Sequence, residues 1–227
     1  MDSIAERVRV VRERIEAAAR RAGRDPDAVR LVAASKTQPV EAIAAAIAAG
    51  VREFGENRAQ ELREKRPLID QDVTWHFIGR LQTNKVKYVI PGAALIHSLD
   101  RLALAEELQR RAEQVGVEVN ALVEVNTSGE TSKGGVSPAD LARFLGALSG
   151  FGRIRVRGLM TMAAPGDPLA ARASFRRLRE LRDALRAEPG GAELSELSMG
   201  MSDDFEIAVE EGATIVRIGT AIFGSRR

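Results

Sequence analysis

The 227-residue chain contains no cysteine, and this absence removes several kinds of chemistry. Disulfides, thiolate nucleophiles and zinc or iron–sulfur sites built from cysteine are all excluded. Histidine is nearly as scarce, since His76 and His97 are the only two. They are too few and too far apart in the sequence for a familiar His-rich metal site. We therefore expect no metal centre.

Blocks of one charge and long apolar runs are also missing. The formal net charge is +2, from 34 basic and 32 acidic residues that are interleaved, so no basic stripe for nucleic acid is expected. The N-terminal segment is charged throughout and lacks the apolar stretch of a signal peptide. No apolar run is long enough to cross a bilayer. The sequence predicts a cytoplasmic protein that binds neither nucleic acid nor membrane.

What the chain does contain is a regular alternation of short β-type runs and helices. An amphipathic helix opens it, with a capping box formed by Ser3 and Glu6 and a stop at Gly23. Eight β-type runs then alternate with helices; they cover residues 29–35, 51–56, 73–79, 94–99, 117–126, 153–162, 192–200 and 213–224.

Alternation of this kind predicts a parallel α/β sheet, and eight strands are the number that closes a (β/α)₈ barrel. A doubly wound open sheet is the alternative. Composition does not shift along the chain, and its length suits one closed barrel. We expect a single TIM-type barrel domain over residues 1–227, with an extra N-terminal helix.

Active sites of such barrels lie where strands end, and Lys36 directly follows the first β-type run. A lysine walled by apolar strands loses its proton more easily than in water, and Schiff-base chemistry with an aldehyde requires the neutral amine. The alternative is a lysine that extends to solvent. Three other lysines, Lys85, Lys87 and Lys133, have polar neighbours and are expected to be solvated.

A second feature lies at the other end of the chain. Gly219 and Thr220 follow the eighth β-type run, and Ser202 is expected to cap the preceding helix. Barrels often bind phosphate in the loops after strands seven and eight, through backbone N–H groups and hydroxyl donors. The alternative is an ordinary glycine turn and helix cap, and Asp203 and Asp204 would repel a phosphate if they faced it.

An amine after strand one and a phosphate site after strands seven and eight describe a pocket for a phosphorylated aldehyde. Pyridoxal 5′-phosphate fits, and so do the sugar phosphates of Schiff-base aldolases. Arg217, if it pointed at the pyridine nitrogen, would keep that nitrogen unprotonated; otherwise it would form a salt bridge within the barrel. Asn57 could bind the cofactor or cap the next helix. His76 is interpreted as a satisfied core residue.

Several longer motifs indicate a protein family. They are VAASKTQP, FGENRAQEL, WHFIGRLQTNKVKYV, GLMTM and LSMGMSDDFEIAVEEGATIVRIGTAIFG, which together span nearly the whole chain in order. At these stretches the sequence resembles the pyridoxal phosphate homeostasis family (YggS/PROSC). Where many relatives have tyrosine after the GEN triplet, this chain has Arg58.

The resemblance implies a fold similar to the N-terminal barrel of alanine racemase (PLP fold type III). It implies pyridoxal phosphate carried on Lys36, with Arg217 facing the pyridine nitrogen and Asn57 beside the ring. The residues that would hold the phosphate are Ser198, Ser202, Gly219 and Thr220.

The resemblance also implies what is lacking for racemisation. Alanine racemase needs a tyrosine base from a second domain, whereas the only tyrosine here, Tyr88, falls on an expected outer helix. We therefore expect a non-catalytic carrier that stores, buffers or delivers pyridoxal phosphate, with apo-enzymes as candidate recipients and a monomeric state. A pyridoxal-phosphate enzyme with weak racemase-type activity and a Schiff-base aldolase remain the alternatives.

Overall fold

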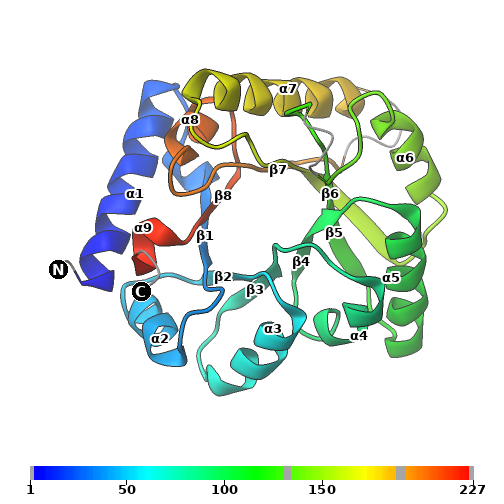
Figure 1. The fold of residues 1–227 in the computed structure, drawn as a ribbon, viewed down its shortest axis with the longest axis horizontal. Coiled ribbons are helices and arrows are strands. Elements are labelled where there is room, and N and C mark those ends of the chain that lie inside the picture. The colour runs from blue at the N-terminus through cyan, green and yellow to red at the C-terminus, as the bar shows by residue number, and fades with distance from the viewer. Residues whose placement is uncertain (1–2, 130–133, 188–192, 225–227) are drawn as a thin grey trace.

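The computed structural model describes residues 3–129, 134–187 and 193–224, and its centre is a closed parallel barrel. The strands follow one another around it in chain order, and β1 pairs with both β2 and β8 (Figure 1). This closure confirms the barrel and excludes the open sheet. The strands are β1 (Arg30–Ala34), β2 (Glu53–Glu56), β3 (Thr74–Phe77), β4 (Leu95–Leu99), β5 (Val119–Glu124), β6 (Ile154–Met160), β7 (Glu196–Ser198) and β8 (Ile215–Ile218).

Helices form an outer ring around the strands (Figure 1). They are α1 (Ile4–Arg21), α2 (Val40–Ala48), α3 (Ala59–Lys65), α4 (Val86–Val89), α5 (Leu102–Val115), α6 (Leu141–Leu148), α7 (Pro168–Arg186), α8 (Phe205–Glu210) and α9 (Thr220–Phe223). The opening helix α1 packs against α2, α8 and α9. As predicted, its Ser3 hydroxyl accepts the Glu6 N–H at 3.2 Å, and Gly23 follows its last turn with a left-handed φ of 65°. None of the helices among the described residues has the length and apolarity needed to cross a membrane.

The apolar core is divided into two parts by the barrel wall. Side chains that face the helices form the larger part, while a small cluster fills the barrel interior; its members are Val32, Leu95, Leu122, Met160 and Ile215. Because side chains alternate between the two faces of a strand, β1, β4, β5, β6 and β8 contribute to both parts. The interior cluster is too small to fill the barrel, and polar side chains complete it.

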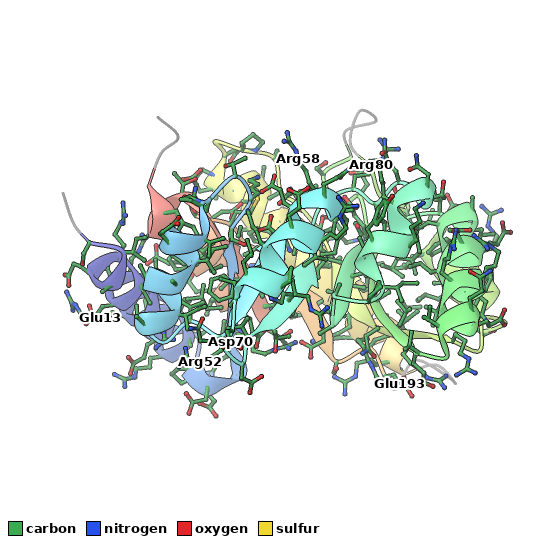
Figure 2. The ribbon with its side chains drawn as sticks, turned by 90° about the horizontal axis from the view of Figure 1, so that it is seen from below. Glu13, Arg52, Arg58, Asp70, Arg80 and Glu193 are labelled. Carbon is green, nitrogen blue, oxygen red and sulfur yellow. The ribbon has the colours of Figure 1, made fainter. Side chains whose placement is uncertain are left out.

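The two ends of the barrel are distinguished in Figure 2. Arg58 and Arg80 follow β2 and β3 and lie along one rim, whereas Arg52 and Asp70 precede these strands and lie at the opposite rim. The first rim is therefore formed by the loops that follow the strands. We call it the mouth, and it is the end at which (β/α) barrels hold their active sites.

Two local expectations at the end of the chain are wrong. The run 213–224 is a strand only as far as Ile218, because Gly219 starts the short helix α9. Ser202 does not cap α8, whose N-cap residue is Asp204. The Ser202 hydroxyl instead accepts the Ala221 N–H at 3.1 Å, which satisfies one of the free backbone donors at the start of α9. Lys133 lies outside the described residues.

Backbone contact between β6 and β7 gives a direct test of the barrel. A Cβ on Gly158 would lie 2.0 Å from the Glu196 carbonyl oxygen. We expect Gly158→Ala to lower the free energy of unfolding by about 3 kcal/mol, because the two strands must separate. Gly146→Ala is the control: this exposed site in α6 has nothing within 4 Å, and alanine should stabilise it by up to about 1 kcal/mol. Urea unfolding measures both, and equal midpoints would contradict the pairing.

Candidate functional site at the barrel mouth

Lys36 lies two residues beyond the end of β1, at the mouth, and its side chain is half-buried. It follows the strand that contributes Val32 to the interior cluster. Within the described part of the chain, its Nζ has no hydrogen bond or ion pair. The amine is thus held near the mouth with no protein group competing for it.

A buried ion-pair network anchors the loop that carries Lys36. Lys65 Nζ donates to the Ser35 carbonyl oxygen at 2.9 Å, to Glu56 Oε1 at 2.9 Å and to Glu61 Oε2 at 2.7 Å. The Ser35 hydroxyl also donates to Glu56 Oε1 at 2.7 Å. Glu56 is fully buried, so this carboxylate depends on Lys65 and Ser35 for its stabilisation.

The next residue of the same loop is strained. Thr37 has a left-handed φ of 63°, which a β-branched residue adopts at a cost of about 1–3 kcal/mol. Its N–H donates to Glu61 Oε2 at 2.7 Å, and its hydroxyl donates to the Lys36 carbonyl oxygen at 2.6 Å. The anchoring network therefore also holds the strained turn that orients the backbone of Lys36.

Arg217 of β8 points into the barrel interior and is 5% exposed. Its Nη1 donates to the Ser198 hydroxyl at 2.5 Å, and its Nη2 donates to the Thr161 carbonyl oxygen at 3.0 Å. Burial lowers the pKa of Arg217 to about 10, against the opposing effect of the carboxylates of Glu124 and Asp204, so it stays charged at neutral pH. The alternative of a salt bridge within the barrel is not found, since no described carboxylate forms an ion pair with it.

Glu124, the last residue of β5, was not selected from the sequence. It is buried, and its pKa is raised by burial and by Asp100, with Arg217 and Arg80 acting in the opposite direction. The signal that could have found it is its place at the carboxyl end of a strand. This carboxyl group completes the charged lining of the mouth opposite β8.

The predicted phosphate residues fall into two sets. Ser202, Gly219 and Thr220 come together where the loops after β7 and β8 meet, linked by the bond from Ala221 N–H to Ser202. The Ser198 hydroxyl is directed instead into the barrel interior, towards Arg217 and His97.

Close backbone packing places the β8 end against the β1 end. A Cβ on Gly219 would lie 3.3 Å from the carbonyl oxygen of Ala34, two residues before Lys36. A larger residue at 219 would push the two loops apart. The glycine therefore allows the predicted phosphate loop and the predicted amine to lie side by side.

Asn57 follows β2 and does not cap the next helix, because the N-cap of α3 is Arg58. Its Oδ1 atom is buried without a hydrogen-bond partner. Gly79 holds this position: a Cβ there would lie 2.3 Å from the Asn57 carbonyl oxygen. Asn57 also lines a cavity of about 690 Å³ at the mouth, together with Arg58, Phe77, Arg80, Lys85, Arg101 and other residues, none of them acidic.

The two histidines, judged too far apart from the sequence, are in contact. They lie on the neighbouring strands β3 and β4, and His76 Nδ1 is 2.9 Å from His97 Nε2. Each stands near the middle of consecutive β-type runs, which is the signal that could have paired them. His97 Nδ1 is 2.9 Å from the Ser198 hydroxyl, so His97 belongs to the surroundings of Arg217.

Comparison with known proteins agrees with this arrangement. Residues 7–227 match the model of the alanine racemase N-terminal domain family. A protein of Aquifex aeolicus (strain VF5) named pyridoxal phosphate homeostasis protein is 50% identical over 224 residues, which cover 98% of each chain. The chain belongs to the pyridoxal phosphate homeostasis protein family.

Solved structures agree with both the family and the fold. The structure of PipY from Synechococcus elongatus PCC7942 with PLP bound is 39% identical, with a TM-score of 0.86, and the match covers 98% of this chain and 100% of PipY. Alanine racemase from Corynebacterium glutamicum is 17% identical, with a TM-score of 0.72. That match covers 95% of this chain but 61% of the racemase, and it shows a shared barrel fold.

The anchoring network predicts a pH-dependent loss of stability. We expect Lys65→Met to lower the free energy of unfolding by about 3–5 kcal/mol, because Glu56 is left buried without its cation. Burial already raises the pKa of Glu56 above its ordinary 4.5, although Ser35 and Lys65 oppose this, and removing the cation raises it further. The deficit should therefore be small below about pH 4.5 and grow as the pH rises above that value.

Lys87→Met is the matched control, because Lys87 is exposed on α4 and its replacement should change stability by less than about 0.5 kcal/mol. Chemical unfolding of both variants across this pH range measures the difference. A deficit for Lys65→Met that does not change with pH would show that Glu56 is not its source.

Proposed function

We infer that this chain binds pyridoxal 5′-phosphate covalently on Lys36 and acts in intracellular homeostasis of the cofactor. One observation carries the proposal: a lysine whose amine has no hydrogen bond or ion pair to any described residue follows β1, and the glycine-containing loop after β8 packs against the end of that strand. Lys36 supplies the amine, and Gly219, Thr220 and Ser202 supply the loop. An amine next to an anion site is what a phosphorylated aldehyde requires.

The residues present fit this cofactor on further grounds. The buried Oδ1 of Asn57 has no partner, so a ligand at the mouth would supply what it lacks. Gly219 leaves no side chain between the β8 loop and Ala34. Arg217 would face the pyridine nitrogen, with Ser198 beside it, and Thr220 and Ser202 would donate to the phosphate.

When bound, pyridoxal phosphate would supply an electrophilic aldehyde, and Lys36 would supply the amine that holds it. The chain's own residues then determine how reactive the cofactor is. Arg217 remains a hydrogen-bond donor at neutral pH and cannot give up its proton readily, so it favours an unprotonated pyridine nitrogen. That arrangement weakens the electron withdrawal on which racemisation and related reactions depend.

The tyrosine that alanine racemase uses as its second base has no counterpart at the described mouth. Tyr88, the only tyrosine in the chain, lies on α4, where its ring is approached by Arg63 at 4.9 Å and Lys87 at 5.0 Å. This phenol lies among cations on the outer ring and is not part of the lining of the mouth cavity. We therefore propose a non-catalytic cytoplasmic carrier, monomeric, that stores, buffers or delivers the cofactor, with apo-enzymes as recipients.

Absorption spectroscopy tests the attachment. The purified protein mixed with pyridoxal phosphate should show a visible band that is absent in Lys36→Ala. Lys85→Ala is the matched control, since Lys85 is another lysine at the mouth, in the loop after β3, and its variant should keep the band. No band in the parent protein would overturn the proposal. A band retained in Lys36→Ala would show that the cofactor is not on Lys36.

Turnover assays on the same protein separate carrier from enzyme. The carrier should interconvert D- and L-alanine at less than about 10⁻³ of a typical enzyme turnover of 10 s⁻¹. Fast racemisation by the loaded protein would make it an enzyme. A borohydride-trapped adduct with a sugar phosphate, in protein that shows no visible band, would instead favour the aldolase.

A further inference from the structure

A row of polar side chains crosses the barrel interior from one end to the other. It begins at Glu53, the first residue of β2, whose Oε2 is 3.1 Å from His76 Nε2. His76 Nδ1 is 2.9 Å from His97 Nε2, and His97 Nδ1 is 2.9 Å from the Ser198 hydroxyl. The Ser198 hydroxyl accepts from Arg217 at 2.5 Å. Five strands thus contribute one residue each, and we call the row the interior relay.

The relay is enclosed along most of its length. His76 is 1% exposed, and His97 and Ser198 are fully buried. Buried polar groups are costly unless each finds a partner. His76 Nε2 and Glu53 Oε2 lie 3.1 Å apart, but in this orientation neither atom makes a hydrogen bond to any described residue. The relay therefore has one weaker link, at the end away from the mouth.

The chemistry of the two ends allows one set of bond directions in which both rings are neutral. An arginine only donates and a carboxylate only accepts. Ser198, which accepts from Arg217, is then free to donate its own proton to His97 Nδ1. His97 donates from Nε2 to His76 Nδ1, and His76 donates from Nε2 to the Glu53 carboxylate. One proton on each group satisfies every link, with both rings neutral and in the same tautomer.

A competing arrangement places a second proton on His76. Both imidazole bonds would then reverse, with His76 donating to His97 and His97 donating to Ser198. Burial, together with the charges of His76, Arg217 and Arg30, holds the pKa of His97 well below its ordinary value, so His97 is the neutral ring in either arrangement. The one-directional arrangement is the one in which every group of the relay needs a single proton.

We propose that Glu53, His76, His97 and Ser198 act as a positioning relay that sets the orientation of Arg217 from the opposite end of the barrel. The four residues are positioning residues, since the contact with a ligand at the mouth belongs to Arg217. The effect of the relay on pyridoxal phosphate binding rests on the proposed function. The relay itself is a property of the protein without cofactor.

Two carboxylates at the end of the barrel away from the mouth allow a matched comparison. Glu53 and Glu196 lie 3.7 Å and 2.9 Å from Arg30, and their side chains are 20% and 24% exposed. Only Glu53 contacts His76, whereas Glu196 accepts from Thr214. Glu53→Gln and Glu196→Gln therefore remove the same charge beside the same arginine, and only the first changes the end of the relay.

Nitrogen NMR of the cofactor-free protein is the deciding experiment. With only two histidines, both imidazoles can be assigned, and we expect each to carry its proton on Nε2 with a bare Nδ1. Glu53→Gln should shift the Arg217 guanidinium resonance and mix the tautomers, while Glu196→Gln should leave both unchanged. Two Nδ1–H rings, a charged His76, or equal effects of the two variants would overturn the proposal.

A second pair of variants controls for the possibility that Glu53→Gln unfolds the barrel locally. Ser198→Ala breaks the relay next to Arg217, whereas Ser98→Ala removes a buried hydroxyl that has no partner. The first should shift the Arg217 resonance and the second should not; equal behaviour would again contradict the relay.

Titration with pyridoxal phosphate then tests the consequence. We expect Glu53→Gln to weaken binding about threefold or more and Glu196→Gln to leave it within about twofold, the effect of one loosened hydrogen bond. If the parent protein binds no cofactor, the proposed function fails and the NMR result still decides the relay. If the parent binds and the two glutamine variants match, the relay fails and the proposed function stands.

Discussion

Closure of β8 onto β1 is the constraint on which the rest of this molecule depends. In that pairing Val32 lies opposite Arg217, so the strand that ends near Lys36 runs beside the strand that carries the buried guanidinium. Residues separated by about 180 positions in the chain therefore share one mouth. Without closure, the first and last strands would be opposite edges of an open sheet. Lys36 and the predicted phosphate loop at Gly219 would then be far apart.

The second constraint is the polar filling of the barrel interior. The apolar interior cluster is small, and two histidines, a serine, an arginine and a glutamate occupy the remaining space. An apolar filling of the same volume would cost less to bury. The polar filling instead gives Arg217 a defined position, because a hydrogen bond has a direction and an apolar contact does not. The polar filling thus lowers stability but orients the Arg217 guanidinium, which would recognise the pyridine nitrogen of the proposed cofactor.

Strain and buried charge are concentrated around the same mouth. Thr37 has an unfavourable backbone angle, Glu56 is a fully buried carboxylate, and the Oδ1 of Asn57 has no hydrogen-bond partner among the described residues. Each feature costs free energy in isolation, and the surrounding network of Lys65 and Glu61 offsets part of it. Strain and buried charge gathered at one end of the barrel are the pattern expected of a functional site.

The sequence by itself determined the barrel and the strand that ends beside Lys36, because alternation and period are local properties. It also supplied the family through its motifs. It did not reveal the contact of His76 with His97, the role of Glu124, or the bond from Ser202 to α9, since each depends on strands or loops that meet only after folding. From the sequence, Asn57 could either bind the cofactor or cap the next helix. The structure places Arg58 at the helix cap and leaves the Asn57 Oδ1 without a hydrogen-bond partner among the described residues. Tertiary structure decided these points because hydrogen bonds between strands depend on register and barrel closure. Both are set by contacts between distant segments and cannot be inferred from a short stretch of the chain.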